Sequence, residues 1–210
     1  MRDRSAPLTA ADLDALAWEK MDGLLPAVVQ DADTGQVLML GYMDRAALAA
    51  TQESGLATFF SRSRNRLWQK GETSGSRLSV QQILIDCDAD ALLVRAVPYG
   101  PTCHLGTPSC FGEDGPAGVG ELGVLARVVH ARAGANPADS YTARLLAEGI
   151  QRIAQKIGEE GVELALAAVG RDAAGCTEEA ADLLYHLTVL MEAKGFGWQD
   201  VARVLEARHG

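Results

Sequence analysis

The spacing of apolar residues changes near Gly118, and this change sets what the chain can fold into. Before that point, apolar residues come in short runs between loops rich in glycine and serine, which is typical of β-strands. After it, they recur every three or four positions, which is typical of amphipathic helices. A length of 210 residues is enough for two small domains. The sequence therefore predicts a β-rich domain followed by a helical one.

The pattern of the residues before Gly118 predicts an α+β domain that is mainly β. Asp33-Thr34-Gly35 forms a hairpin turn between the first two strands, and Asp44 caps a short helix over residues 46–50. The expected strands are 27–31, 37–43, 57–61, 78–86 and 91–97.

Residues 113–121 are expected to form a linker, because the segment Gly-Glu-Asp-Gly-Pro-Ala-Gly-Val-Gly at 112–120 has little to bury. This places one domain at 1–112 and the other at 122–210. The second domain reads as an all-α helical bundle, with Ser140 and Thr177 as N-caps. The expected helical segments are 124–129, 140–169, 177–193 and 198–208.

The charge balance argues against general nucleic-acid binding. The chain has 28 acidic and 19 basic side chains and a net charge of −9, so it lacks the basic footprint of nucleic-acid-binding proteins. No run approaches the ~18–20 uncharged apolar residues of a membrane span. Four cysteines are too few for a secreted disulfide framework. We therefore expect a cytoplasmic protein without a membrane partner, in which clustered cysteines hold metal or do chemistry.

Four acidic residues of the helical part are predicted to gather at one level. Residues three apart share a helix face, so Glu160 projects with Glu163, and Glu179 with Asp182. In an antiparallel hairpin, one pair would then stand opposite the other. Carboxylates this close need a counter-charge, and Mg²⁺ suits oxygen ligands and bridges them to phosphates. The alternative is a solvated helix face.

Lys156 lies one turn before these acids. It is predicted either to bind a phosphate of the substrate or to form an ion pair with Glu160 along the helix.

Three cysteines of the β-rich part are candidate zinc ligands. Cys103 and Cys110 are separated by six residues, wider than in a zinc finger, and Cys87 lies between two aspartates. Three thiolates would leave zinc one open position for a water molecule, as in catalytic sites. His104, next to Cys103, is a fourth ligand, an acid–base group or an ordinary loop histidine. A buried free thiol is the alternative for each cysteine.

Asp86, Asp88 and Asp90 would share one side of the chain if the preceding strand continued through them, with Cys87 on the other side. One ion can hardly collect both sets within one chain. We therefore expect two sites: magnesium at the aspartates and zinc at the cysteines. Cys87 would be able to reach a site on a partner subunit. The alternative for the aspartates is a solvated turn.

Positive charge is concentrated between residues 62 and 70. In an acidic protein such a cluster suits a bound anion, and arginine forks suit phosphate. Trp68 would stack on a purine or fill the core. RNA binding is the alternative function of this segment. The negative net charge of the chain and the presence of only one aromatic residue in the segment argue against it. The expected substrate-binding residues of this part are Arg62, Arg64, Trp68, Lys70, Glu72 and Ser74.

Residues 24–111 resemble the phosphoribosyl-AMP cyclohydrolases. The motifs that match are Ser61-Arg-Ser-Arg with Leu67-Trp-Gln-Lys-Gly-Glu-Thr-Ser-Gly75, Asp86-Cys-Asp-Ala-Asp90, and Pro101-Thr-Cys-His-x-Gly-x-x-Ser-Cys-Phe111. The resemblance implies zinc at the three cysteines, with Cys87 given by the other subunit of a homodimer. It also implies magnesium at the three aspartates and a role for His104 in the hydrolysis.

The helical part resembles the all-α nucleotide pyrophosphohydrolases. The shared pattern is Glu159-Glu160-x-x-Glu163 followed by Glu179-x-x-Asp182, and Ser140-Tyr-Thr-x-x-Leu145 with Lys156-Ile-Gly-Glu-Glu-Gly is similar to the phosphoribosyl-ATP pyrophosphatase branch. This resemblance implies an ATP-derived substrate and magnesium-dependent release of pyrophosphate, with Glu160 and Glu163 as catalytic residues and Lys156 at the substrate.

Together the two parts resemble the bifunctional hydrolases of histidine biosynthesis. The resemblance implies that the helical part converts phosphoribosyl-ATP to phosphoribosyl-AMP and that the β-rich part then opens the adenine ring. The alternative is a zinc-stabilised regulator that binds a phosphorylated metabolite, fused to a house-cleaning nucleoside triphosphate pyrophosphohydrolase.

Overall fold

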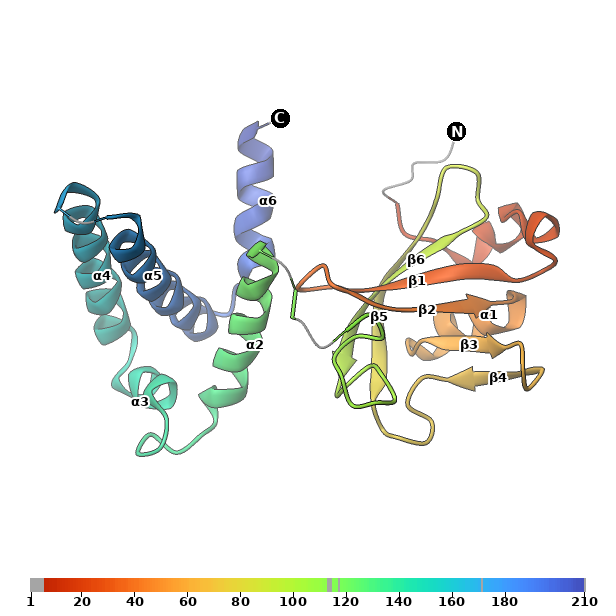
Figure 1. Cartoon of the computed structure of the whole chain (residues 1–210), viewed down its shortest axis with the longest axis horizontal. Helices are drawn as coiled ribbons and strands as arrows, with labels where there is room; N and C mark the ends of the chain where they lie inside the picture. The colour runs from red at the N-terminus through yellow and green to blue at the C-terminus, as the bar shows by residue number, and fades with distance from the viewer. Residues whose placement is uncertain (1–5, 113–114, 117, 171, 210) are drawn as a thin grey trace. The chain divides into compact units, whose positions relative to one another are not determined.

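The computed structural model describes residues 6–112, 115–116, 118–170 and 172–209. It divides into two compact units, Met1–Gly120 and Glu121–Gly210, one β-rich and one helical (Figure 1). Residues 113, 114 and 117 of the expected linker lie outside the described residues, and the short 3-10 helix η3 follows at Gly118–Gly120.

The β-rich unit is built on a four-stranded mixed sheet of order β2-β1-β6-β5. Strand β1 (Leu25–Asp31) pairs antiparallel with β2 (Val37–Met43) and parallel with β6 (Leu92–Tyr99). Strand β5 (Arg77–Ile85) forms an antiparallel pair with β6. The 3-10 helices η1 (Ala10–Ala15) and η2 (Trp18–Met21) precede the sheet. The predicted mainly-β, α+β class is confirmed.

The predicted turn and cap have clear local causes. The buried Asp31 side chain accepts a hydrogen bond from the Asp33 backbone N–H (3.0 Å), which fixes the turn between β1 and β2. Asp44 Oδ1 accepts the Ala47 N–H (2.7 Å), so Asp44 is the N-cap of α1 (Arg45–Ser54).

The core of this unit lies on β1, β2, β6 and α1. Leu25, Val29, Leu48 and Val94 are fully buried, and so is Phe59 from the neighbouring strand. A side chain at Gly41 would collide with the Phe59 ring. Glycine at this position therefore lets the aromatic ring pack directly against β2.

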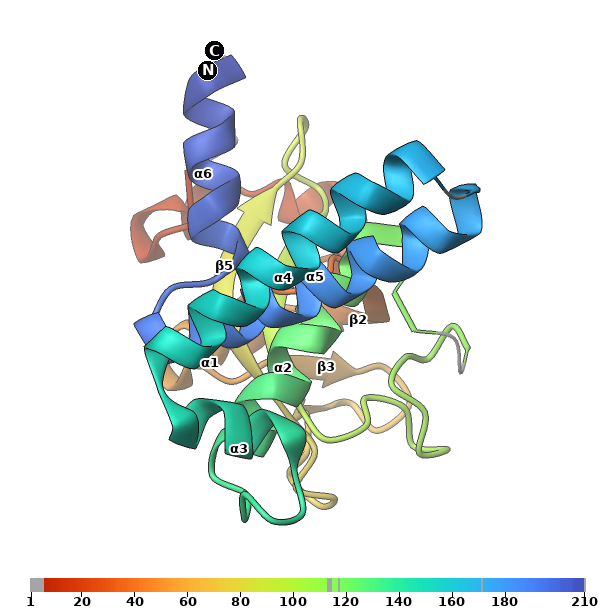
Figure 2. The same cartoon turned by 90° about the vertical axis from the view of Figure 1, so that its left-hand side faces the viewer.

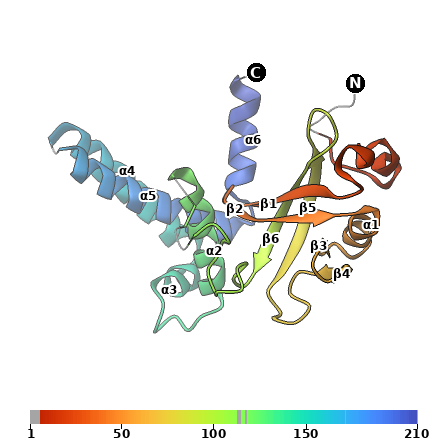
Figure 3. The ribbon, with the colours of Figure 1, turned by 45° about the vertical axis from the view of Figure 1, so that its right-hand side comes forward.

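One strand was not predicted. Arg66–Gln69 forms β4, which pairs antiparallel with β3 (Thr58–Ser61), so only parts of the basic segment are loop. The Trp68 ring lies 5.2 Å from the Phe59 ring, and this contact stabilises a strand whose composition resembles a loop. Figure 3 shows the β3–β4 pair beside α1.

The helical unit confirms the predicted all-α class. Helices α4 and α5 run antiparallel and side by side (Figure 2), and the core contains Val129, Leu145, Ile153 and Val189. The helices are α2 (Glu121–Ala133), α3 (Tyr141–Glu148), α4 (Ile150–Gly170), α5 (Ala173–Lys194) and α6 (Trp198–His209).

The largest differences from the predicted helices lie within the segment 140–169 and at the start of α5, whereas α2 extends the expected segment 124–129 at both ends. The segment 140–169 is not one helix, because Gly149 (φ +89°) ends α3 and α4 starts anew. Ser140 caps α3 as predicted, whereas Thr177 is not the N-cap of α5. That cap is Asp172, which accepts the Gly175 N–H (3.0 Å), while the Thr177 hydroxyl donates to the Ala173 carbonyl inside the helix.

No helix within the described ranges has the combined length and apolar character that crossing a membrane requires.

The Asp44 cap can be tested by substitution. Asp44→Ala removes the acceptor for the Ala47 N–H and should lower the free energy of unfolding of the β-rich unit by about 1 kcal/mol. Urea unfolding of the full chain measures this, with Trp198→Phe as background so that the tryptophan signal comes from Trp18 and Trp68. Asp44→Asn, which keeps an acceptor, should stay close to the unaltered stability. Equal losses in the two variants would contradict the cap.

Candidate functional site

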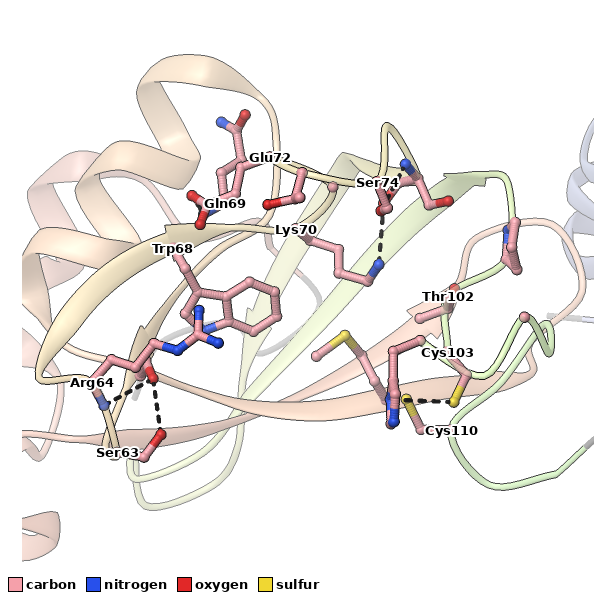
Figure 4. Close-up of a pocket in the computed structure, with 18 residues that line it drawn as sticks. Ser63, Arg64, Trp68, Gln69, Lys70, Glu72, Ser74, Thr102, Cys103 and Cys110 are labelled. Atoms are coloured by element: carbon pink, nitrogen blue, oxygen red, sulfur yellow. Dashed lines mark hydrogen bonds between the residues drawn. The ribbon is translucent and has the colours of Figure 1, made fainter.

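A cavity of about 630 Å³ in the β-rich unit collects eight of the thirteen site residues predicted for that unit. Figure 4 shows Arg64 and Trp68 on one side, Cys103 and Cys110 on the other, and the Lys70 side chain between them. The predicted residues that line the cavity are Arg64, Trp68, Lys70, Glu72, Ser74, Cys103, His104 and Cys110. The lining segments 61–76 and 101–110, which are separated by 24 residues in the sequence, therefore meet at one cavity.

The two cysteines are placed by a loop that is bonded to the start of β2. The Cys110 N–H donates to the Leu38 carbonyl (2.8 Å), and the Ser109 hydroxyl donates to the Val37 carbonyl (2.8 Å). Within the loop, the Cys103 N–H donates to the Thr107 carbonyl (3.0 Å). These bonds hold both thiols at the wall of the cavity.

The two thiols differ in acidity. The Leu105 backbone N–H and then the Thr107 hydroxyl lower the pKa of Cys103, because they donate hydrogen bonds that favour the thiolate. Burial and the neighbouring Cys103 raise the pKa of Cys110. His104 is exposed, and its Nδ1 lies 3.9 Å from Cys103 Sγ. Two thiols of different acidity and an imidazole are thus close enough to act on one group.

Lys70 brings a partly desolvated positive charge to the same cavity. Burial lowers the pKa of its ammonium group, while Cys110 and Cys103 favour the charged form. Its Nζ donates to the Ser76 carbonyl (3.2 Å). Since no carboxylate among the described residues forms an ion pair with Lys70, an anionic ligand would supply such a counter-charge.

The basic segment divides into two parts. Arg64 lines the cavity, whereas the Arg62 guanidinium stacks on the Tyr42 ring (3.9 Å) outside that lining. Arg66 pairs with Glu72 (3.0 Å), and this hydrogen bond lowers the pKa of the Glu72 carboxyl. Trp68 packs on Phe59, which is one of its two predicted uses, and it also lines the cavity. Its stacking on a purine stays a prediction.

The three aspartates converge, although not for the reason predicted. Residues 86–90 leave β5 and form a turn with Ala89 at φ +62°, so the strand does not continue through them. Ligand oxygens of Asp86, Asp88 and Asp90 nevertheless lie within 4.8 Å of one another. Asp86 Oδ1 accepts the Asp90 and Ala91 N–H groups, which closes the turn. Such an oxygen set suits a hard divalent cation.

Cys87 lies far from the other two cysteines. It is exposed in the turn after β5, while the cavity lies beyond the opposite end of the β5–β6 hairpin. At about 3.3 Å per residue, the nine residues of β5 put these ends roughly 27 Å apart. Among the described residues, neither cluster of metal-ligating groups includes a cysteine. The three thiols therefore do not meet within one chain.

The helical unit brings its acids together as predicted. Ligand oxygens of Glu160, Glu179 and Asp182 lie within 4.8 Å of one another across the α4–α5 hairpin. Glu163 lies beside this set, and the negative charge of Glu160, followed by burial and Glu179, raises the pKa of its carboxyl. Lys156 Nζ lies 2.8 Å from Glu160 Oε1 and from Glu159 Oε2, so the predicted ion pair along the helix is present.

Three residues near these groups were not predicted. Lys20 reaches from η2 to pair with Asp88 and with Asp90 (2.6 Å); it lies 68 positions before Asp88, and no local pattern connects them. Thr102 is buried at the cavity, and its hydroxyl has no hydrogen-bond partner among the described residues, which leaves it available to a ligand. His186 is buried and lies four positions after Asp182. This spacing puts both residues on one face of the helix and is the sequence signal that points to His186.

Comparison with known proteins assigns each unit to a family. Residues 39–112 match the model of the phosphoribosyl-AMP cyclohydrolase family, and residues 122–209 match that of the phosphoribosyl-ATP pyrophosphohydrolase family.

Relatives match almost the whole chain. The histidine biosynthesis bifunctional protein HisIE of Xanthomonas axonopodis pv. citri is 56% identical over 96% of each chain. The protein of the same name from Xylella fastidiosa (strain Temecula1) is 57% identical over 94% of each chain. The one from Vibrio parahaemolyticus is 51% identical over 95% of this chain and 98% of its own.

The predicted resemblance is thus confirmed for both parts and for their order. The chain belongs to the family of bifunctional hydrolases of histidine biosynthesis, in which a phosphoribosyl-AMP cyclohydrolase domain precedes a phosphoribosyl-ATP pyrophosphohydrolase domain.

Proposed function

We propose that this chain carries out two consecutive hydrolyses, the second and third steps of histidine biosynthesis. The helical domain, 122–210, releases pyrophosphate from phosphoribosyl-ATP. The β-rich domain, 1–112, then opens the adenine ring of phosphoribosyl-AMP to give the phosphoribosylformimino aminoimidazole carboxamide ribotide, and 113–121 links the two. The observation that carries this proposal is that each family match lies within one unit and each unit has its own cluster of reactive groups.

In the helical domain, Glu160, Glu163, Glu179 and Asp182 would hold magnesium. Three of these carboxylates already lie within 4.8 Å of one another, which fits the oxygen ligands that Mg²⁺ prefers. When bound, magnesium would neutralise charge on the substrate phosphates and activate water. Glu163, whose pKa is raised, is suited to accept the proton of the attacking water at its carboxylate. Lys156 pairs with Glu160 and would also contact a phosphate of the substrate.

In the β-rich domain, the cavity is suited to a phosphoribosyl nucleotide. Arg64 and Lys70 would bind phosphate, the Ser74 hydroxyl would donate a hydrogen bond to it, and the purine would stack on the Trp68 indole. Glu72 would orient Arg66 and accept a hydrogen bond from a hydroxyl of the ribose. Arg62 would contact the substrate only if its guanidinium group moved off the Tyr42 ring.

The donor set of Cys103 and Cys110 fits zinc, because both thiols lie at the cavity and one has a lowered pKa. When bound, zinc would act as a Lewis acid that makes water nucleophilic at neutral pH. His104 would transfer protons at its ring nitrogens between that water and the departing ring nitrogen. Asp86, Asp88 and Asp90 would hold a separate magnesium ion, with Lys20 as their counter-charge in its absence.

We further propose a homodimer in which the partner subunit supplies Cys87. The hairpin geometry supports this, since Cys87 and Cys103 lie at opposite ends of β5–β6 in one chain. Helix α4 also leaves an apolar face exposed at Val162 (60%), Leu166 (67%) and Val169 (90%). These residues share one side of the helix, and a second copy would cover it. All four thiols are unpaired, which suits a cytoplasmic location.

The two activities should be separable by substitution. Cys103→Ala should lower ring opening by more than about 100-fold, because even an outer partner of a metal ligand is worth roughly 10–100-fold, and should leave pyrophosphate release intact. Glu163→Gln should do the reverse. Pyrophosphate release from phosphoribosyl-ATP measures the first step, and the absorbance change of ring opening, with phosphoribosyl-AMP supplied directly, measures the second. Loss of both steps in either variant would contradict the division between domains.

The shared site should show complementation between subunits. Cys87→Ala and Cys103→Ala chains are each expected to be inactive in ring opening. After unfolding and refolding as a mixture, half of the dimers are mixed, and each holds one complete site, so about a quarter of the unaltered activity should return. Refolding each variant by itself is the control. Absence of recovery in a mixture shown to contain mixed dimers would exclude the sharing of Cys87.

The thiol acidities predict an order of alkylation. In protein freed of metal by a chelator, Cys103 has a lowered and Cys110 a raised pKa. Because the thiolate reacts, alkylation of Cys103 should reach half of its own maximum at lower pH than that of Cys110. Mass spectrometry after a short pulse of iodoacetamide measures both. Cys176, in the helical unit, is the internal reference, and the reverse order would refute the assignment.

A further inference from the structure

The motif Ser140-Tyr141-Thr142 has no role in the chemistry proposed above, yet it bonds directly to α5. Ser140 caps α3 through the Ala143 N–H (3.2 Å). The Tyr141 hydroxyl lies 3.1 Å from His186 Nε2, and the Thr142 hydroxyl lies 2.8 Å from the Tyr185 hydroxyl. Two consecutive residues of α3 therefore hold two consecutive residues of α5.

The contacts of His186 determine where its proton lies. Its ring is only 5% exposed, and Nδ1 lies 2.9 Å from the Asp182 carbonyl oxygen. A carbonyl only accepts hydrogen bonds, so Nδ1 carries the hydrogen. In the neutral imidazole Nε2 is then the acceptor, and the Tyr141 hydroxyl, 3.1 Å away, donates to it. The Tyr185 ring contacts His186 edge-on (5.1 Å between centroids) and restricts the orientation of the imidazole.

His186 Nδ1 also lies 3.6 Å from Glu160 Oε1, so the imidazole that is bonded to the Asp182 carbonyl lies directly against this carboxylate. The same oxygen lies 2.8 Å from Lys156 Nζ, and the Glu160 residue is only 5% exposed. One carboxylate oxygen is therefore paired with an ammonium group on α4 and is in contact with an imidazole on α5. Its carboxylate is one of the three that converge across the hairpin with Glu179 and Asp182.

We propose that Tyr141 and His186 are positioning residues for this acidic cluster. Tyr141 selects the tautomer of His186, and His186 aligns Glu160 with the Asp182 turn of α5, so the three carboxylates are arranged before a divalent cation binds. Hydrogen-bond partners of metal ligands act in this way in many metal sites. The inference rests on the proposed magnesium site of the helical domain, and it gives the Ser-Tyr-Thr motif a function.

Two tyrosine substitutions provide a matched test. Tyr141→Phe removes the donor to His186, whereas Tyr185→Phe removes an equivalent bond between α3 and α5 but keeps the ring contact with the imidazole. The full chain is used with Asp86, Asp88 and Asp90 changed to Asn, so that bound Mn²⁺ reports on the helical domain. Electron paramagnetic resonance of free Mn²⁺, without substrate, measures the affinity.

Tyr141→Phe should weaken Mn²⁺ binding by about 10-fold, within the range seen for outer partners of metal ligands, and Tyr185→Phe should leave it unchanged at a similar thermal midpoint. His186→Asn, which places an amide N–H near the position of Nδ1, should retain more affinity than His186→Leu. The kcat for pyrophosphate release by Tyr141→Phe should fall at limiting Mg²⁺ and recover at excess Mg²⁺, which a merely structural role would not produce.

Glu160→Gln separates failure of this inference from failure of the proposed site. If Glu160→Gln loses Mn²⁺ affinity while Tyr141→Phe equals the unaltered chain, the positioning role is refuted and the metal site stands. If Glu160→Gln itself keeps full affinity, the metal site is refuted, and the positioning role with it. Equal weakening by Tyr141→Phe and Tyr185→Phe would also overturn the inference, because it would indicate a general loss of the α3–α5 contact.

Discussion

Repulsion between carboxylates is the constraint that shapes the acidic cluster of each unit. Each unit places three carboxylate ligand atoms within 4.8 Å of one another, and such groups stay ionised together only with positive charge nearby. A lysine supplies it in each case: Lys20 for the aspartates of the β-rich unit and Lys156 for the glutamates of the helical unit. The same concentration of negative charge is what would favour a divalent cation.

Hairpin geometry determines which groups meet within one chain. The α4–α5 hairpin puts its acids at one level, so Glu160 of one helix meets Glu179 and Asp182 of the other. The β5–β6 hairpin does the opposite, because the cavity lies beyond one end and Cys87 lies in the turn at the other. This difference is why we propose a helical site complete within one chain and a thiol site completed by a second copy.

The reactive side chains are held by bonds from ordered elements rather than by exposed loops alone. The Cys103–Cys110 loop is bonded to β2 through the Val37 and Leu38 carbonyls, and Glu160 pairs with Lys156 and lies against the His186 ring. Charged groups kept in one orientation lose little entropy when a ligand binds. This property is shared by the two units although their folds are unrelated.

The sequence by itself determined the features that depend on local geometry. The two periodicities separate β-rich from helical parts, Asp44 and Ser140 mark helix starts, and the i, i+3 spacing of the acids fixes their common face, because backbone dihedral angles act over a few residues. Only the tertiary structure decided that Arg66–Gln69 is a strand, that Arg62 turns away from the cavity, and that Lys20 and His186 reach the acidic clusters. These features depend on which segments, distant in the sequence, pack against each other in the fold. The local sequence of a short segment does not specify the segment against which it packs.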